Sequence, residues 1–230
     1  MNVKVAFTPS EEVAAPLGVV IDVLRATSVM CQALAAGYER ITCVGEVDQA
    51  LARKADGVQL AGERANVRPE GFDFGNSPRE FADRAGSGSL VLTTTNGTRL
   101  LLAASSRCDE VIVGSLLNFD AVVRAVRESG VDEVAFLCAG VEGAFAIDDA
   151  FVAGAFAAAI GSDPDDAATA AVRLASTFPS DEDGIGGGVS AENIRRVGLE
   201  ADIPWCARRS ELDVLPRVVG RSGGAVDVSL

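Results

Sequence analysis

The chain has 230 residues, of which 48% are hydrophobic and 5% aromatic, and it carries a formal net charge of −13. This length and hydrophobic content suffice for one large domain with a mainly aliphatic core. The acidic balance argues against nucleic acid as a partner, because contact with a phosphate backbone requires a basic face.

Strands alternate with helices from residue 17 onward. Apolar, β-branched runs predict strands at 17–22, 40–44 and 58–60, and helical spacing of small and apolar residues predicts helices over 26–37 and 46–55. The same order returns later, with predicted strands at 90–92, 111–113 and 134–138 and predicted helices over 98–105, 118–128 and 148–160. Such alternation is typical of an α/β protein whose largely parallel sheet is flanked by helices.

Two of these rounds are similar in plan. Segments 17–60 and 90–130 each place a polar loop before a helix and end the next strand at Val-Gly. This shared plan predicts an internal repeat within a single unit that spans residues 1–230.

Two stretches interrupt the alternation. Residues 62–80 have neither helical nor strand periodicity, yet Phe72 and Phe74 provide apolar anchors, so we expect an ordered loop with a functional role. Residues 179–188, PSDEDGIGGG, are acidic and rich in glycine, and we expect them to form a mobile surface connection.

The chain contains no histidine. This absence excludes mechanisms that need an imidazole, among them those of phosphohistidine phosphatases, Ser-His-Asp hydrolases and Cys-His proteases. Neither the phosphate-binding P-loop pattern nor the Gly-x-Gly-x-x-Gly pattern follows a predicted strand. Acid–base chemistry must therefore use carboxylates, hydroxyls, a thiol or metal-bound water.

The cellular setting follows from the cysteines and the apolar runs. Five cysteines are scattered without a Cys-x-x-Cys pair, which favours reduced thiols over a disulfide framework or a zinc site. The first residues turn acidic at once and do not resemble a signal peptide. The richest apolar run, 151–160, is too short to span a bilayer. We therefore expect a cytoplasmic protein that does not bind membranes.

Polar segments follow several predicted strands, and ligands of open α/β sheets bind at the carboxyl ends of the strands. The segments that would meet there are DVLRAT at 22–27, GER at 62–64, the loop residues 71–78, TTTNGT at 93–98 and CAGVEGAFAIDD at 138–149. Backbone N–H groups at helix N-termini bind anions, and arginine binds phosphate through two donors. Clustered carboxylates without histidine suit an oxygen-liganded Mg²⁺ ion.

Each segment also has a purely structural interpretation. Thr27 or Thr95 at a helix start commonly serves as an N-cap, and Asp148 and Asp149 favour the positive end of the helix dipole. The two arginines can form ordinary salt bridges, and Cys138 can lie in the core. The functional interpretation depends on all five segments meeting at one edge of the sheet.

The TTTNGT corner carries more oxygen than a helix cap needs. Capping takes one side-chain oxygen, whereas Thr94, Thr95, Asn96 and Thr98 offer four beside Gly97, which admits close backbone approach. This excess predicts an anion cradle, in which hydroxyls and the N–H groups of Gly97 and Thr98 face a phosphate or sulfonate.

The motifs DVLRATS, GER, GFDFGNSP, TTTNGT, SLLN and CAG…DDAFVAG, in this order and spacing, closely resemble the ComB family of 2-phosphosulfolactate phosphatases. The match runs from about residue 17 to residue 160 and is weaker in the last third of the chain. The resemblance implies a three-layer α/β/α fold of two similar, intertwined halves. It also implies a Mg²⁺-dependent phosphatase that acts on a small acidic phosphate monoester such as 2-phosphosulfolactate, and it is compatible with a homodimer.

We assign roles to residues within these motifs. Asp22, Arg25, Glu63 and Arg64 are expected to be catalytic, and Asp22, Glu63 and Asp149 to hold the metal. The expected substrate-binding residues are Thr27, Asp73, Asn76, Ser77, Thr94, Thr95, Asn96, Gly97, Thr98, Asn118 and Cys138. Whether water or a side chain attacks the phosphorus is left open. Two alternative functions also stand: a non-catalytic small-anion-binding protein, and a sugar-phosphate isomerase or lyase that uses the same anion cradle.

Overall fold

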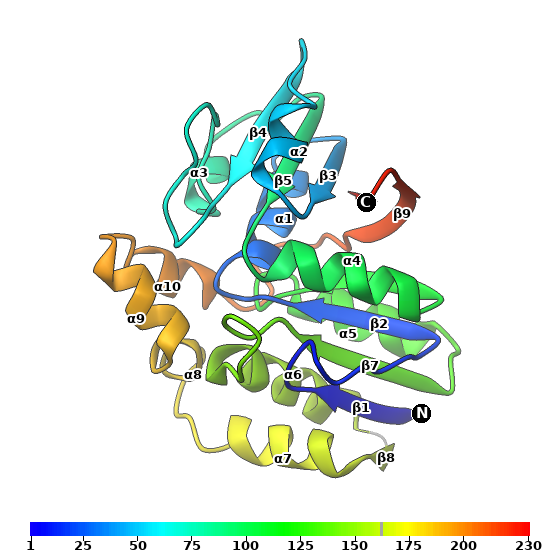
Figure 1. The fold of residues 1–230 in the computed structure, drawn as a ribbon. Helices are drawn as coiled ribbons and strands as arrows, with labels where there is room; N and C mark the ends of the chain where they lie inside the picture. Colours follow the sequence, from blue (N-terminus) through cyan, green and yellow to red (C-terminus); the bar gives the residue numbers. More distant parts are fainter. Residues whose placement is uncertain (162) are drawn as a thin grey trace.

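The computed structural model describes residues 1–161 and 163–230 (Figure 1). Its strands form one mixed sheet in the order β4-β5-β3-β10-β9-β6-β2-β7-β1-β8. The strands are β1 (Asn2–Ala6), β2 (Leu17–Ile21), β3 (Arg40–Val44), β4 (Val58–Gly62), β5 (Ser89–Thr93), β6 (Glu110–Gly114), β7 (Glu133–Cys138), β8 (Asp163–Pro164), β9 (Arg217–Ser222) and β10 (Ala225–Ser229). The helices are α1 (Ala26–Ala35), α2 (Val47–Leu51), α3 (Arg79–Ala82), α4 (Gly97–Arg107), α5 (Phe119–Glu128), α6 (Ile147–Ile160), α7 (Asp166–Ala175), α8 (Asp181–Gly186), α9 (Val189–Arg196) and α10 (Asp202–Cys206).

The sheet has two parts that a hairpin joins. The first part consists of β4, β5 and β3, and the second of β6, β2, β7, β1 and β8; neighbouring strands within each part are parallel. The antiparallel hairpin β9–β10 connects the parts, since β10 pairs with β3 and β9 with β6. The chain crosses from the second part to the first through α1 and returns through α4 (Figure 1). The predicted α/β class with a largely parallel sheet is confirmed.

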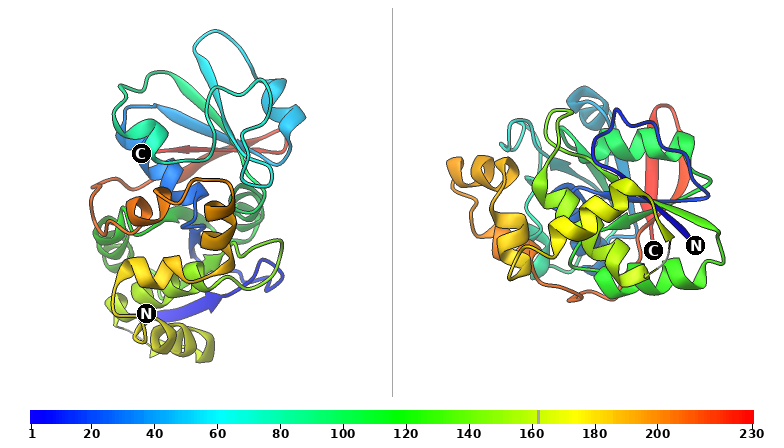
Figure 2. Two further views of the ribbon diagram at one scale, coloured as in Figure 1. Left: turned by 90° about the vertical axis from the view of Figure 1, so that its left-hand side faces the viewer. Right: turned by 90° about the horizontal axis from the view of Figure 1, so that it is seen from below.

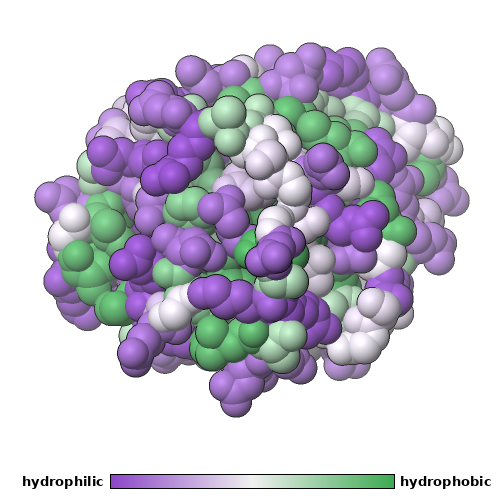
Figure 3. All heavy atoms as spheres, turned by 90° about the horizontal axis from the view of Figure 1, so that it is seen from above, coloured by the Kyte–Doolittle hydropathy of each residue, from purple (hydrophilic) through white to green (hydrophobic). Residues whose placement is uncertain are grey.

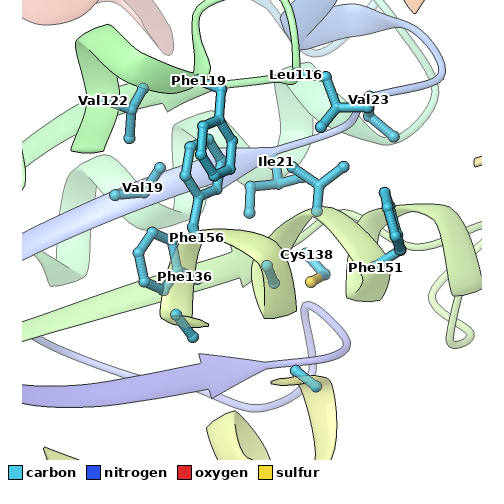
Figure 4. Packing of buried hydrophobic residues seen from close by; sticks show 14 of the residues in the cluster. Val19, Ile21, Val23, Leu116, Phe119, Val122, Phe136, Cys138, Phe151 and Phe156 are labelled. Atoms are coloured by element: carbon cyan, nitrogen blue, oxygen red, sulfur yellow. The ribbon is translucent and has the colours of Figure 1, made fainter. Parts of the chain in front are cut away.

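Helices cover both faces of the sheet, which explains the continuous apolar runs in its strands. Every residue of β2, LGVVI, is buried, as expected for a parallel strand covered on both sides. On one face, Val19 and Ile21 belong to a core with α5 and α6, where the stacked rings of Phe119 and Phe156 have centroids 4.7 Å apart (Figure 4). On the other face, Val20 belongs to a core that combines α1, α4 and both parts of the sheet. Helices α1 and α4 therefore hold the two parts together.

The prediction that residues 179–188 form a mobile connection is wrong. The segment contains α8, and its Ile185 is fully buried. Ser180 caps the helix, because its hydroxyl accepts a hydrogen bond from the Asp183 N–H at 3.1 Å, and acidic residues stabilise the first turn. A cap and one buried side chain order this segment despite its glycine content.

The long loop at 62–80 keeps the predicted anchors, since Phe72 and Phe74 are both buried, and it ends at the start of α3.

Helices α9 and α10 lie along the junction between the two parts of the sheet (Figure 2). Seen from above, the surface is mainly hydrophilic, with small separate hydrophobic patches (Figure 3). No described helix combines the length and the apolar composition needed to cross a bilayer.

Candidate active site

A cavity of about 120 Å³ lies at the carboxyl ends of β2, β4, β5 and β7. Both parts of the sheet contribute to it, and so do all five segments that the sequence predicts to meet. The charged residues of its wall are Asp22, Arg25, Glu63, Glu142, Asp148 and Asp149. We call this cavity the acidic pocket, because five carboxylates face one arginine.

Asp22 follows β2 directly and is held at the start of α1. The hydroxyl of Thr27 donates to the Asp22 carbonyl at 2.8 Å, and the Asp22 carboxylate accepts the Ala26 N–H at 3.3 Å. The start of α4 approaches the same carboxylate, since a Cβ at Gly97 would lie 2.5 Å from Asp22 Oδ2. Glycine at position 97 therefore allows two helix N-termini to converge on one carboxylate.

Glu63 follows β4 and is fixed by two backbone donors. Its Oε1 accepts the Thr95 N–H and its Oε2 accepts the Asn66 N–H, both at 2.8 Å. Ala65 and Asn66 form the tip of a tight turn with φ of 50° and 63°, a left-handed conformation that is uncommon for residues other than glycine. Such strained backbone at a pocket is often associated with function.

A second tight turn lines the pocket after β7. Glu142, at its tip, has φ of 52°, and its N–H donates to Asn96 Oδ1 at 3.1 Å. This contact links the turn to the threonine corner that precedes α4. Asn96 therefore positions a pocket loop and does not cap its own helix through a side-chain hydrogen bond.

Asp148 and Asp149 enter the pocket from the first turn of α6. Asp149 accepts the N–H of Val23 and the N–H of Gly140, each at 2.9 Å, and so fixes the loops after β2 and β7. Asp148 accepts a hydrogen bond from the Ser190 hydroxyl at 2.9 Å. Asp148 and Asp149 thus lie at the positive end of the α6 dipole, as predicted, and also line the pocket.

The carboxyl groups of the pocket are hard to ionise together. Burial raises the pKa of Asp22 to about 7, and the charges of Asp148 and Glu63 add to the shift. Burial likewise raises the pKa of Asp148 to about 6, against the Ser190 hydrogen bond. The pKa of Asp149 lies well above its usual range because of burial and the charges of Asp148 and Asp22. A bound cation would relieve this repulsion.

The oxygen donors of the pocket fit a Mg²⁺ ion. Within residues 1–161 and 163–230, no three acidic side chains are grouped closely enough to hold an ion by themselves. Magnesium is commonly bound by one or two carboxylates, with waters and substrate oxygens completing its shell. Asp22 and Glu63 both face the pocket and interact electrostatically, so they can serve as that pair. Asp149 as a third ligand stays a prediction: each of its oxygens accepts a backbone N–H, as each Glu63 oxygen does, and a carboxylate oxygen keeps a second lone pair for an ion.

Arg25 is the buried cation of the site. Its side chain is 1% exposed, and its Nη1 donates to Asp202, which is itself fully buried, at 2.8 Å. Ser77, a predicted binding residue, donates its hydroxyl to the same carboxylate at 2.6 Å. Asp202 lies 177 residues away in the chain and carries no sequence signal that would have revealed this pairing.

Three predicted site residues do not face the acidic pocket. Arg64 donates to the backbone carbonyls of Glu63 and Gly45, so its guanidinium is turned away. Asp73 accepts the Leu60 N–H at 2.8 Å and fixes the loop against β4. Asn118 closes the turn before α5. Its side-chain amide donates to the carbonyls of Val113, at 3.0 Å, and Val214, and its Oδ1 accepts hydrogen bonds from Ser115. In this structure the side chains of these three residues hold loops in place, and their direct roles in catalysis or binding stay predictions.

Four further predicted residues are buried beneath the pocket. Thr27 bonds to Asp22, and Thr94 and Thr98 bond to each other, with the Thr98 N–H donating to Thr94 Oγ1 at 3.1 Å. Cys138 is fully buried in the core (Figure 4), and burial raises the pKa of its thiol well above the ordinary value. At the TTTNGT corner, only Thr95 and Asn96 line the acidic pocket, and Asn96 Oδ1 accepts the Glu142 N–H, so three of the four predicted oxygens serve local structure.

The pocket also contains residues that sequence reasoning missed. Asn66, Ser190 and Asn193 line it, and the last two come from α9. The SAEN stretch at 190–193 has no periodicity or motif that marks a ligand, so its contribution follows only from the position of α9 against the sheet.

Comparisons with known proteins agree with this geometry. A family model described as 2-phosphosulpholactate phosphatase matches residues 4–221. A "Probable 2-phosphosulfolactate phosphatase" of Thermus thermophilus is 37% identical over 98% of both chains, and one of Thermotoga maritima is 36% identical over 94% of this chain and 95% of the relative. The "2-phosphosulfolactate phosphatase" of Methanothermobacter thermautotrophicus is 35% identical over 91% of this chain and 89% of the relative. The chain therefore belongs to the 2-phosphosulfolactate phosphatase family.

Proposed function

We propose that this protein is a Mg²⁺-dependent phosphatase that hydrolyses a small acidic phosphate monoester, with 2-phosphosulfolactate as its substrate. Family membership supports the reaction class and the substrate. The observation that supports the metal dependence is the cluster of buried carboxylates, whose pKa values are raised by burial and, for Asp22 and Asp149, by the charges of their neighbours.

The residues of the pocket have different roles in the proposed reaction. Asp22 and Glu63 would hold the ion, and the ion would supply positive charge to the phosphoryl oxygens. Arg25 also lines the pocket and would stabilise negative charge on the transferring group. Asp148, which accepts a hydrogen bond from Ser190 and whose pKa burial raises to about 6, could serve as the general acid that gives a proton to the leaving oxygen.

Phosphate release in the presence and absence of magnesium tests the proposal. The assay uses 2-phosphosulfolactate and related phosphorylated hydroxy acids, first with Mg²⁺ and then with excess EDTA. We expect turnover that EDTA abolishes and added Mg²⁺ restores; full activity under thorough chelation would refute the metal dependence. Substrate consumption without phosphate release would indicate an isomerase or lyase, and thermal stabilisation without consumption would indicate a binding protein.

A further inference from the structure

A second cavity, of about 530 Å³, adjoins the acidic pocket. Arg25, Asn66 and Asn76 belong to the walls of both cavities, so the two cavities lie side by side. The charge of the second cavity is of opposite sign, because Arg25, Arg68 and Arg79 line it together with a single glutamate. We call it the arginine chamber. A ligand that spans both cavities would meet carboxylates at one end and guanidinium groups at the other.

The junction between the cavities contains buried polar atoms without partners. Arg25 Nε and Asn76 Oδ1 are buried, and neither has a hydrogen-bond partner among the described residues. Asn76 is 6% exposed and Arg25 is 1% exposed. Buried polar atoms are nearly always paired, and leaving one unpaired is costly. The free Arg25 N–H donor, together with an Asn76 amide that can turn either end toward a ligand, indicates that a ligand crosses this junction.

The chamber has free positive charge at its mouth. Asp202 neutralises Arg25 at the junction, but Arg79 Nη1 lies 4.0 Å from that carboxylate, and the Arg79 side chain is 47% exposed. Arg68 donates one hydrogen bond, from Nη1 to the Asp73 carbonyl, at 3.2 Å. Most donors of Arg79 therefore stay available for a ligand. A guanidinium binds a carboxylate or sulfonate with two parallel hydrogen bonds, which suits this position.

We propose that the arginine chamber binds the non-reacting anionic group of the ester, and that Arg79 determines specificity for esters that carry such a group. The inference rests on the proposed phosphatase function, in which the phosphoryl group occupies the acidic pocket. A net charge of −13 repels anions at long range, so a substrate with additional negative charge requires local cations. The chamber supplies them on the side away from the carboxylates.

A matched pair of esters tests the role of Arg79. Isopropyl phosphate has the carbon skeleton of 2-phospholactate with a methyl group in place of the carboxylate. We expect Arg79→Gln to lower the ratio of kcat/KM for 2-phospholactate over isopropyl phosphate at least tenfold, mainly through the KM of the acid. Arg124→Gln is the control, because it removes the same charge from a side chain that is 53% exposed on α5; its ratio should equal that of the wild type.

Two kinds of result would contradict the proposal or its basis. If Arg79→Gln leaves the ratio of kcat/KM for the two esters unchanged, whether or not both values fall, the proposal is overturned. A urea titration establishes that the variant is folded. If the wild type releases phosphate from neither ester, calorimetric binding of the same two esters decides the role of the chamber; the proposed phosphatase function fails only if 2-phosphosulfolactate is not hydrolysed either. A preference for 2-phospholactate that disappears in Arg79→Gln would sustain the role of the chamber, and the absence of any preference would overturn it.

Discussion

Replacing Gly97 by alanine probes the closest approach in the site. A Cβ at this position would lie 2.5 Å from the Cβ of Ala26 and 2.5 Å from Asp22 Oδ2, so the starts of α1 and α4 would have to separate. Overpacking of this kind costs about 1–3 kcal/mol, and the better helix propensity of alanine returns up to about 1 kcal/mol. We expect a net loss of about 1–2 kcal/mol, which corresponds to a fall in Tm of roughly 2–8 °C for a chain of this size.

Activity should respond more strongly than stability to this substitution. Displacement of a catalytic group by about 1 Å can cost about 100-fold in rate, so we expect Gly97→Ala to lower kcat by roughly 10- to 100-fold. The assay combines urea denaturation with phosphate release at saturating Mg²⁺. Gly45→Ala is the control, because its Cβ would meet nothing closer than 3.8 Å. If Gly97→Ala matches this control in both stability and kcat, the proposed convergence of the two helices on Asp22 is refuted.

Three further predictions concern buried groups. Asp202→Ala should destabilise the protein by about 3–5 kcal/mol in urea titrations, because it leaves Arg25 buried without a counter-ion; a loss below about 1 kcal/mol would contradict the importance of this pair. In EDTA, the free energy of unfolding should fall as the pH rises from about 4 to about 7, since the folded protein retains protons on Asp22 and Asp148 that the unfolded chain releases; stability that rises over this range would oppose the raised pKa values. Cys138→Ser should keep kcat within about threefold, because a buried thiol of raised pKa supplies no thiolate, whereas a loss of several orders of magnitude would indicate a covalent thiol step.

The elements with strong local patterns were predictable from the sequence. The strand predicted at 40–44 has the bounds of β3, and the strand predicted at 17–22 ends within one residue of β2. Both are short apolar runs with a polar segment after them, and burial on both faces makes that signal strong. The hairpin β9–β10 was overlooked, although a Gly-Gly turn at 223–224 between two Val-containing runs is a recognised hairpin signal. The internal repeat stays a prediction.

The location of the site was more predictable than its members. Strand ends bring segments together at one edge of the sheet, so the sequence alone predicts that Asp22, Glu63 and Asp149 lie there. Side-chain direction is a different matter: Arg25 and Arg64 both follow strands, yet only Arg25 turns inward, because Asp202 on α10 supplies its buried counter-ion. That partner is set by tertiary packing over 177 positions, which no local pattern encodes.

The order in which the chain supplies its strands affects how the protein must fold during synthesis. β2 lies between β6 and β7, and β1 lies between β7 and β8, so the first two strands pair only with segments beyond residue 109. Until those residues leave the ribosome, β1 and β2, which are largely and wholly apolar, have no strand to pair with. The strands of the first part of the sheet, within residues 40–93, have by then all been synthesised. Pairings so distant in sequence fold slowly and expose apolar surface to aggregation. Nascent chains that stall before residue 110 should therefore depend on chaperones, and they should acquire resistance to proteolysis only after β7 emerges.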